Sequence, residues 1–164
     1  MVKIYLLFIA ISLVPVALSY GADPAGMLPK LLKFNVDTSN ERQVFRALMC
    51  LYLASSASWV IAALTPEWQI AGLIWAVLFM LSLALGRLLS IVLDGRPTAA
   101  LLDIYLAVEL AAGALGLWLL VAVRANIGKE LVLGAGEATA DAAKDASSKH
   151  CAIRRGSKRA IQAQ

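Results

Sequence analysis

The chain has 164 residues, of which 60% are hydrophobic and 16% charged, and its formal net charge is +4. Soluble domains contain roughly 45–50% apolar and about 25% charged residues, so the excess of apolar residues must lie in lipid and no large soluble enzyme fits beside it. Eight of the 15 basic residues lie after Val123, and these are not interleaved with aromatics, which argues against nucleic-acid binding and favours a membrane surface.

The chain offers few side chains for cofactor chemistry. His150 is its only histidine, whereas a bis-histidine haem or a histidine-rich metal site needs several. Cys50 falls in a predicted span and Cys151 in a polar tail, so a disulfide between them is not expected. We therefore expect no cofactor.

The first apolar run, residues 4–20, is predicted to cross the membrane as a helix with a kink at Pro15. Lys3, the apolar run and small residues after it are also the ingredients of a cleaved signal peptide, so the retention of residues 1–22 stays open. Tyr20 is poorly suited to a cleavage site and three further apolar runs follow. These features favour a retained first helix.

The connection at 21–43 alternates apolar residues with Lys30 and Lys33. This pattern is consistent with a short amphipathic segment lying along the membrane interface with its lysines at the headgroups. A plain solvated loop explains it equally well.

The second and third runs are predicted as spans over 44–64 and 69–93, with Asn40 as the signal that starts the second. Residues 65–68, Thr-Pro-Glu-Trp, form a turn so short that the two spans must be an antiparallel hairpin. Trp59, Trp68 and Trp75 surround this turn, as aromatics do at a membrane interface.

A helix-stopping Asp-Gly-Arg-Pro-Thr segment at 94–98 precedes the fourth predicted span, 100–123. Gly113 and Gly116 lie on one side of this span, where small residues allow close approach of another helix. The predicted fold is an all-α integral membrane protein. Residues 1–123 form a four-helix up-down bundle, and residues 124–164 form a polar, partly disordered basic tail.

Within the tail, Gly134 and Gly136 are too little to indicate phosphate binding. Five of its eight basic residues are predicted to contact anionic lipid headgroups; they are Lys149, Arg154, Arg155, Lys158 and Arg159. An even number of spans places both termini on one side of the membrane, and the positive charge of the tail favours the cytoplasmic side.

Four ionisable side chains fall inside the apolar runs: Arg46, Arg87, Asp103 and Glu109. Each costs about 2.5–3.5 kcal/mol at the centre of a span, so each should pair, face the bundle interior or reach the interface. We predict an ion pair, direct or water-bridged, between Arg87 and Glu109. The predicted polar cluster is Arg46, Arg87, Ser90 and Glu109, with Asp94 and Asp103 at its rim and Cys50 on the same helical face as Arg46.

This cluster has two interpretations. It either holds the helices together, or it is a ligand or proton site, because a carboxylate beside an arginine at membrane depth is typical of proton relays. Arg46 and Asp103 also lie near enough to helix ends to reach the interface.

The sequence resembles a family of small bacterial membrane proteins, the domain-of-unknown-function family 4345, over about residues 4–122. The matching stretches are FRALMCLYLA at 45–54, GRLLSIVLDGRP at 86–97 and Glu-Leu at 109–110. Where Cys50 stands, the family usually has glycine. The resemblance implies a four-helix protein of the bacterial inner membrane, distantly similar to DoxX-like proteins, and it implies no reaction.

Three functions are compatible with these features. The first is a non-enzymatic accessory or scaffold subunit of a larger membrane assembly, which small size and the lack of catalytic motifs favour. The second is a transporter of a small molecule, or one coupled to protons, that uses Glu109. The third, a quinone-linked redox accessory protein, rests on the DoxX-like resemblance alone.

Overall fold

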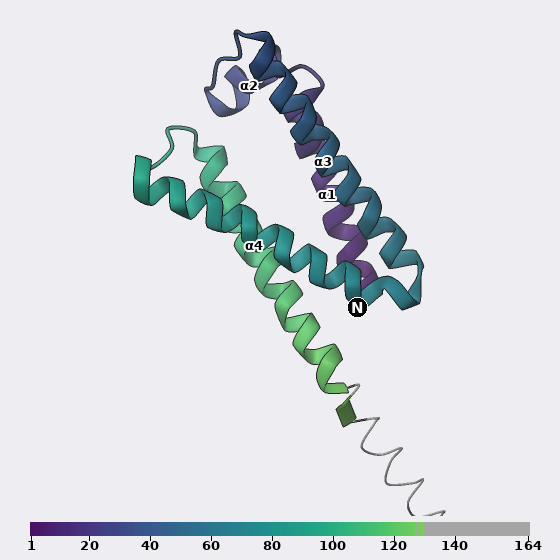
Figure 1. Ribbon diagram of the computed structural model, residues 1–164. Helices are drawn as coiled ribbons and strands as arrows, with labels where there is room; N and C mark the ends of the chain where they lie inside the picture. Colours follow the sequence, from purple (N-terminus) through teal and green to yellow (C-terminus); the bar gives the residue numbers. More distant parts are fainter. Residues whose placement is uncertain (127, 130–164) are drawn as a thin grey trace, which may run out of the picture. The chain divides into compact units, whose positions relative to one another are not determined.

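The computed structural model describes residues 1–126, 128 and 129, and the regular secondary structure of this part is helical, with no strand. In chain order the elements are α1 (Val2–Gly21), α2 (Pro24–Leu32), α3 (Ser39–Leu64), the 3₁₀ turn η1 (Pro66–Trp68), α4 (Gln69–Asp94) and a last long helix, Ala100–Asn126 (Figure 1). We call the last one the fourth spanning helix. Four helices are long and apolar enough to cross a bilayer, which confirms the predicted all-α membrane fold.

Each predicted span lies inside one observed helix, but α3 begins at Ser39, five residues before the predicted start. The extension follows from a capping box at Thr38. The Thr38 hydroxyl accepts a hydrogen bond from the Glu41 N–H (3.2 Å), and the Glu41 carboxylate accepts one from the Thr38 N–H (2.9 Å). The choice of Asn40 as start signal is therefore wrong, because the Thr-x-x-Glu pattern two residues earlier supplies the cap.

The long connection contains a helix, α2, so the plain-loop alternative is wrong. Asp23 caps α2 by accepting a hydrogen bond from the Gly26 N–H (3.2 Å). Leu28 is fully buried, whereas Lys30 and Lys33 are exposed. α2 is thus amphipathic, as the alternation of lysines and apolar residues predicts.

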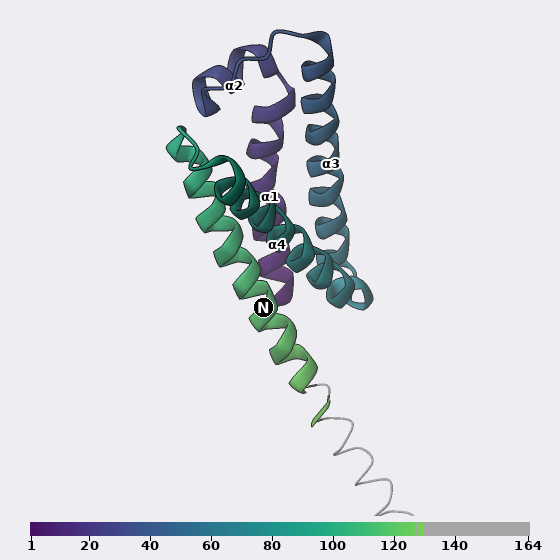
Figure 2. The same ribbon diagram turned by 60° about the vertical axis from the view of Figure 1, so that its left-hand side comes forward.

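α1 and α3 pack antiparallel and side by side in both views (Figure 1; Figure 2). Leu6, Ala10 and Leu13 of α1 are buried in the hydrophobic core. The one polar bond across the contact between α1 and α3 joins the Ser56 hydroxyl to the Ala10 carbonyl oxygen (2.7 Å), which satisfies a buried hydroxyl where water is absent.

η1 reverses the chain, and α4 returns antiparallel to α3, as the predicted hairpin requires. Both views show α4 diverging from α3 with distance from η1 (Figure 1; Figure 2). Between them, Phe79 meets the rings of Tyr52 and Trp59 edge-on, at 5.6 and 5.3 Å between centroids. Trp59 is fully buried there, so its ring packs inside the bundle and does not face lipid, and its predicted place at the depth of the membrane interface stays a prediction.

The fourth spanning helix contacts α1 and α4. The Tyr5 hydroxyl of α1 donates a hydrogen bond to the Ala112 carbonyl oxygen (2.8 Å). A Cβ atom at Gly113 would lie 2.5 Å from the Leu81 side chain, and one at Gly116 would lie 2.5 Å from the Tyr5 hydroxyl. The predicted close approach at these two glycines is confirmed.

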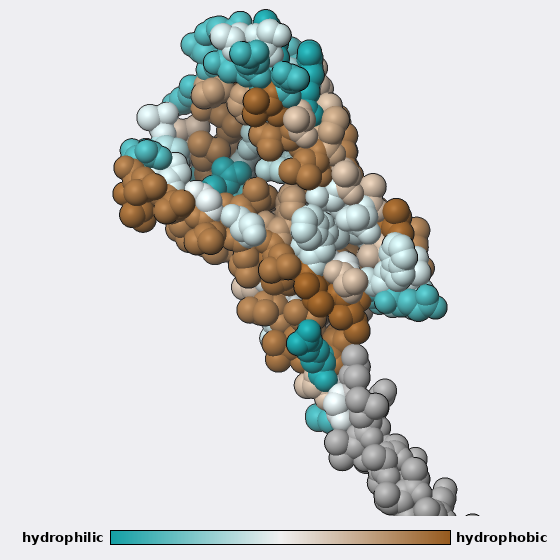
Figure 3. All heavy atoms as spheres, viewed as in Figure 1, coloured by the Kyte–Doolittle hydropathy of each residue, from teal (hydrophilic) through white to brown (hydrophobic). Residues whose placement is uncertain are grey.

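Many large apolar side chains point outward, among them Val92 (80% exposed) and Ile4 (73% exposed). In Figure 3 hydrophobic surface covers the helices, and hydrophilic surface gathers at the end formed by α2 and at the η1 turn. Soluble monomers rarely expose such large apolar areas. This apolar surface and the four apolar helices together indicate a multi-pass membrane protein.

Met1–Val121 form one compact unit, and Ala122–Gln164 are assigned to a second. Within the predicted tail, 124–164, helix continues through Asn126. Residues 127 and 130–164 lie outside the described part of the chain. The predicted domain boundary and the disorder of the tail stay predictions.

Candidate functional site

The predicted ion pair between α4 and the fourth spanning helix is present as a direct contact. The Arg87 Nε–H donates to both carboxylate oxygens of Glu109, at 3.0 Å from Oε1 and 2.9 Å from Oε2. The side chain of Arg87 is 20% exposed and that of Glu109 is 9% exposed. The pair therefore joins two helices with both charges largely withdrawn from the surface.

The depth of the pair explains why these charges meet. Arg87 lies seven residues before the end of α4 at Asp94, which is roughly 10 Å along a helix with a rise of about 1.5 Å per residue. At such a depth, an isolated charge would cost several kcal/mol. Since α4 and the fourth spanning helix are consecutive and antiparallel, pairing is the least costly arrangement.

Tyr105 adds an aromatic face to the pair. The Arg87 guanidinium carbon lies 5.4 Å from the centroid of the Tyr105 ring, a cation–π distance. Tyr105 stands one helical turn before Glu109, so the two residues share a helix face. The sequence interpretation missed Tyr105, although its spacing of four residues from Glu109 was a usable signal.

An apolar pocket of about 140 Å³ reaches the ion pair. It is bounded by α1, α3, α4 and the fourth spanning helix, and Arg87 and Glu109 are its charged lining residues. Tyr52 of α3 lines it as well and is another site residue that the sequence interpretation missed. Figure 3 shows a hollow on this face with hydrophilic surface inside a hydrophobic surround.

A second cavity, of about 380 Å³, lies toward the turn between α4 and the fourth spanning helix. Its lining combines Arg87 with the predicted residues Ser90, Asp94 and Asp103. The Ser90 hydroxyl donates to Asp94 Oδ2 (3.2 Å). Arg87 thus stands between an apolar pocket and a polar one.

Comparison with known proteins gives one result. The family model described as "Domain of unknown function (DUF4345)" matches residues 1–120. The chain belongs to this family. No curated protein and no solved structure matches the chain.

The DUF4345 match covers all three stretches that carry the predicted resemblance. It does not extend to the DoxX-like proteins, so that more distant similarity stays a prediction. The family description assigns no function, and the site must be interpreted from its own geometry.

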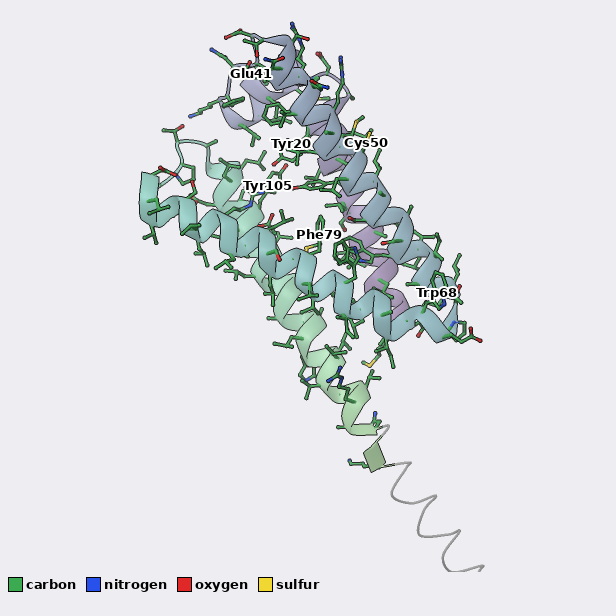
Figure 4. All side chains as sticks on the ribbon, viewed as in Figure 1. Tyr20, Glu41, Cys50, Trp68, Phe79 and Tyr105 are labelled. Atoms are coloured by element: carbon green, nitrogen blue, oxygen red, sulfur yellow. The ribbon has the colours of Figure 1, made fainter. Side chains whose placement is uncertain are left out.

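The proposed place of Arg46 in the polar cluster is wrong. Arg46 and Cys50 are both exposed, and in Figure 4 Cys50 lies on the outer side of α3. Among the described residues Arg46 makes no ion pair. Arg46 precedes Tyr52 by six residues, which in a helix of 3.6 residues per turn places it roughly 120° around the axis, so it cannot face the pocket that Tyr52 lines. Its exposed side chain is free to reach the headgroups, the alternative raised for it above.

Two further predictions concern metal binding and the residues of the tail. In the described part of the chain, no group of three or more His, Cys, Asp or Glu side chains could hold a metal ion. The predicted lipid-contacting residues Lys149, Arg154, Arg155, Lys158 and Arg159 lie outside the described residues, as do His150, Cys151 and the two glycines at 134 and 136.

Proposed function

We propose that this DUF4345 protein is a non-enzymatic accessory or scaffold subunit of a larger assembly in the bacterial inner membrane, with both termini cytoplasmic. The proposal is carried by the open groove that remains where α4 diverges from α3. This groove has a volume of about 280 Å³, and its walls include Leu51, Trp75, Leu78 and Ser82.

A transmembrane helix of another subunit is the occupant that suits this groove. Membrane helices associate through close van der Waals contact and small or hydroxyl-bearing residues, and the groove combines bulky apolar walls with Ser82. The ion pair supports the same role, because Arg87 and Glu109 neutralise each other within the chain and need no substrate to balance them.

Leu78→Trp and Leu89→Trp test the proposal as a matched pair. Both leucines lie on α4 and are 56% and 55% exposed, but only Leu78 lines the groove. After extraction from the native membrane in mild detergent, the wild type and Leu89→Trp should migrate with co-purifying subunits, and Leu78→Trp should migrate alone. A free, compact monomer for the wild type counts against the proposal, and equal complexes for the two variants count against the groove.

The pocket at Glu109 favours a second candidate, a small-molecule or proton-coupled transporter. A carboxylate lining a cavity is the element that such a transporter needs. Proteoliposomes should then show pH-dependent flux that Glu109→Gln abolishes. Absence of flux in the wild type would remove this candidate, and a quinone-linked redox role would be tested by quinone co-purification.

For the tail we propose salt-sensitive attraction of Lys149, Arg154, Arg155, Lys158 and Arg159 to anionic lipid, worth about 1 kcal/mol or less for each residue. A synthetic peptide of residues 145–164 should bind anionic vesicles at low salt and leave them at high salt. Equal binding to neutral vesicles would contradict this.

A further inference from the structure

Two side chains that line the apolar pocket keep hydrogen-bond donors that have no acceptor within the described chain. Arginine carries five N–H donors, of which Arg87 uses its Nε–H on Glu109 and donates one more side-chain hydrogen bond to the Tyr20 hydroxyl. Three N–H donors of Arg87 therefore remain without an acceptor among these residues. The Tyr52 hydroxyl also has no partner among these residues, and Tyr52 is only 7% exposed.

We infer that this pocket binds a neutral, mainly apolar molecule that presents a carbonyl or similar oxygen to Arg87 and Tyr52. Donors at membrane depth need an acceptor, since hydrocarbon provides none. A ligand oxygen in the pocket that both side chains line would satisfy these donors without disturbing the ion pair.

The charge of the site selects a neutral ligand. Arg87 and Glu109 cancel within hydrogen-bonding distance, so an anion would gain from the guanidinium and lose to the neighbouring carboxylate. A cation would be attracted by the carboxylate and repelled by the guanidinium. A carbonyl oxygen accepts hydrogen bonds and adds no charge.

The size and position of the pocket define the rest of the ligand. A cavity of about 150 Å³ holds a benzene ring, and this one is about 140 Å³, so it encloses one ring or a short chain of a ligand whose remainder stays in the bilayer. Phe8 and Val108 line it and are 68% and 57% exposed. The pocket therefore opens sideways, and an apolar molecule dissolved in the bilayer can enter between α1 and the fourth spanning helix.

A photoreactive ketone, 4-heptylbenzophenone, tests the site in proteoliposomes of the full chain. On illumination its carbonyl inserts into neighbouring C–H bonds, and peptide mass spectrometry locates the label. We expect labelling within residues 8–16 and 105–112. Heptyl benzoate, which has an acceptor, should compete about tenfold better than heptylbenzene, which has none, as expected for a hydrogen bond to a charged donor.

Matched variants separate a specific site from partition into lipid. Val108 and Ile104 are both 57% exposed on the same helix, but only Val108 lines the pocket. Val108→Trp should abolish the labelling and Ile104→Trp should retain it. Tyr52→Phe, which keeps the ring, should weaken competition by heptyl benzoate and leave that by heptylbenzene unchanged. Labelling spread over all helices, equal competition by both compounds, or labelling unchanged in Val108→Trp would overturn the inference.

Two lipids distinguish the sources of the carbonyl. In detergent, a diacyl phosphatidylethanolamine should displace the probe and its ether-linked analogue should not, if the natural ligand is the ester group of a membrane lipid. If neither lipid displaces the probe and heptyl benzoate does, the natural ligand is a separate lipophilic carbonyl compound. Displacement by the ether lipid equal to that by the ester lipid would refute recognition of the carbonyl oxygen.

Discussion

Replacement of Glu109 by leucine should destabilise the protein more than replacement of both members of its ion pair. Breaking a buried pair costs about 3–5 kcal/mol, because one charge is left without a partner. Arg87 retains 20% exposure and lies near enough to the membrane face to turn toward it, so we expect about 2–3 kcal/mol for Glu109→Leu. The double change, Arg87→Leu with Glu109→Leu, leaves no lone charge and should lie within about 1 kcal/mol of the wild type.

A double-mutant cycle measures this coupling. Unfolding with sodium dodecyl sulfate in mixed micelles, followed by helical circular dichroism, gives the free energy for each variant. If Arg87→Leu costs about as much as Glu109→Leu, the coupling between the two changes should be about 3 kcal/mol or more, which is at least about a hundredfold in the unfolding equilibrium constant. Arg46→Leu serves as the control, because Arg46 is exposed and has no ion-pair partner among the described residues, so its effect should add to that of Glu109→Leu. Additivity of the Arg87 and Glu109 changes would refute the structural role of the pair.

The same unfolding measurement tests four further changes. Gly113→Ala, whose Cβ would meet Leu81, should cost about 1–3 kcal/mol, whereas Gly86→Ala, with open space around its Cβ, should stabilise by up to about 1 kcal/mol. Trp59→Phe removes a buried N–H that has no partner in the described structure, which offsets part of the cost of the cavity left by the smaller ring, so we expect a loss of about 1–3 kcal/mol; a loss above about 4 kcal/mol would contradict the assignment of this N–H as unpaired. Thr38→Ala removes the cap of α3 and should cost about 1 kcal/mol, and an unchanged stability would show that this helix end contributes nothing.

The sequence predicts the spans and the ion pair because both follow from strong constraints. Apolar runs of this length form transmembrane helices in most cases. Two opposite charges on consecutive antiparallel helices have the lowest free energy in the membrane when they pair. Tyr105 was accessible by the same logic, since it shares a helix face with Glu109. The sequence did not indicate that Arg87 would use a single N–H on the carboxylate, because that depends on how far the two helices stand apart.

The sequence predicts the wrong face of α3 as the one that points into the bundle, and this error has a physical cause. In a soluble helix the polar residues mark the outside, but lipid and helix interior are both apolar, so hydrophobic periodicity does not identify the inner face of a membrane helix. The polar residues Arg46 and Cys50 were assigned to the interior, whereas Tyr52 and Trp59 occupy it.

The divergence of α4 from α3 cannot be predicted from the sequence either, because it depends on which side chains of the two helices contact each other. Near η1, Gly72 faces Ala62, and these small residues let the backbones approach closely. Farther along, Phe79 projects from α4 toward α3 (Figure 4) and fills the space against Tyr52, so the helices separate. The small contact at one end and the aromatic contact beyond it set the crossing of the two helices. That crossing leaves the groove beside Phe79 and places Tyr52 in the lining of the Arg87 pocket, so the packing of one aromatic pair shapes both of the sites proposed here.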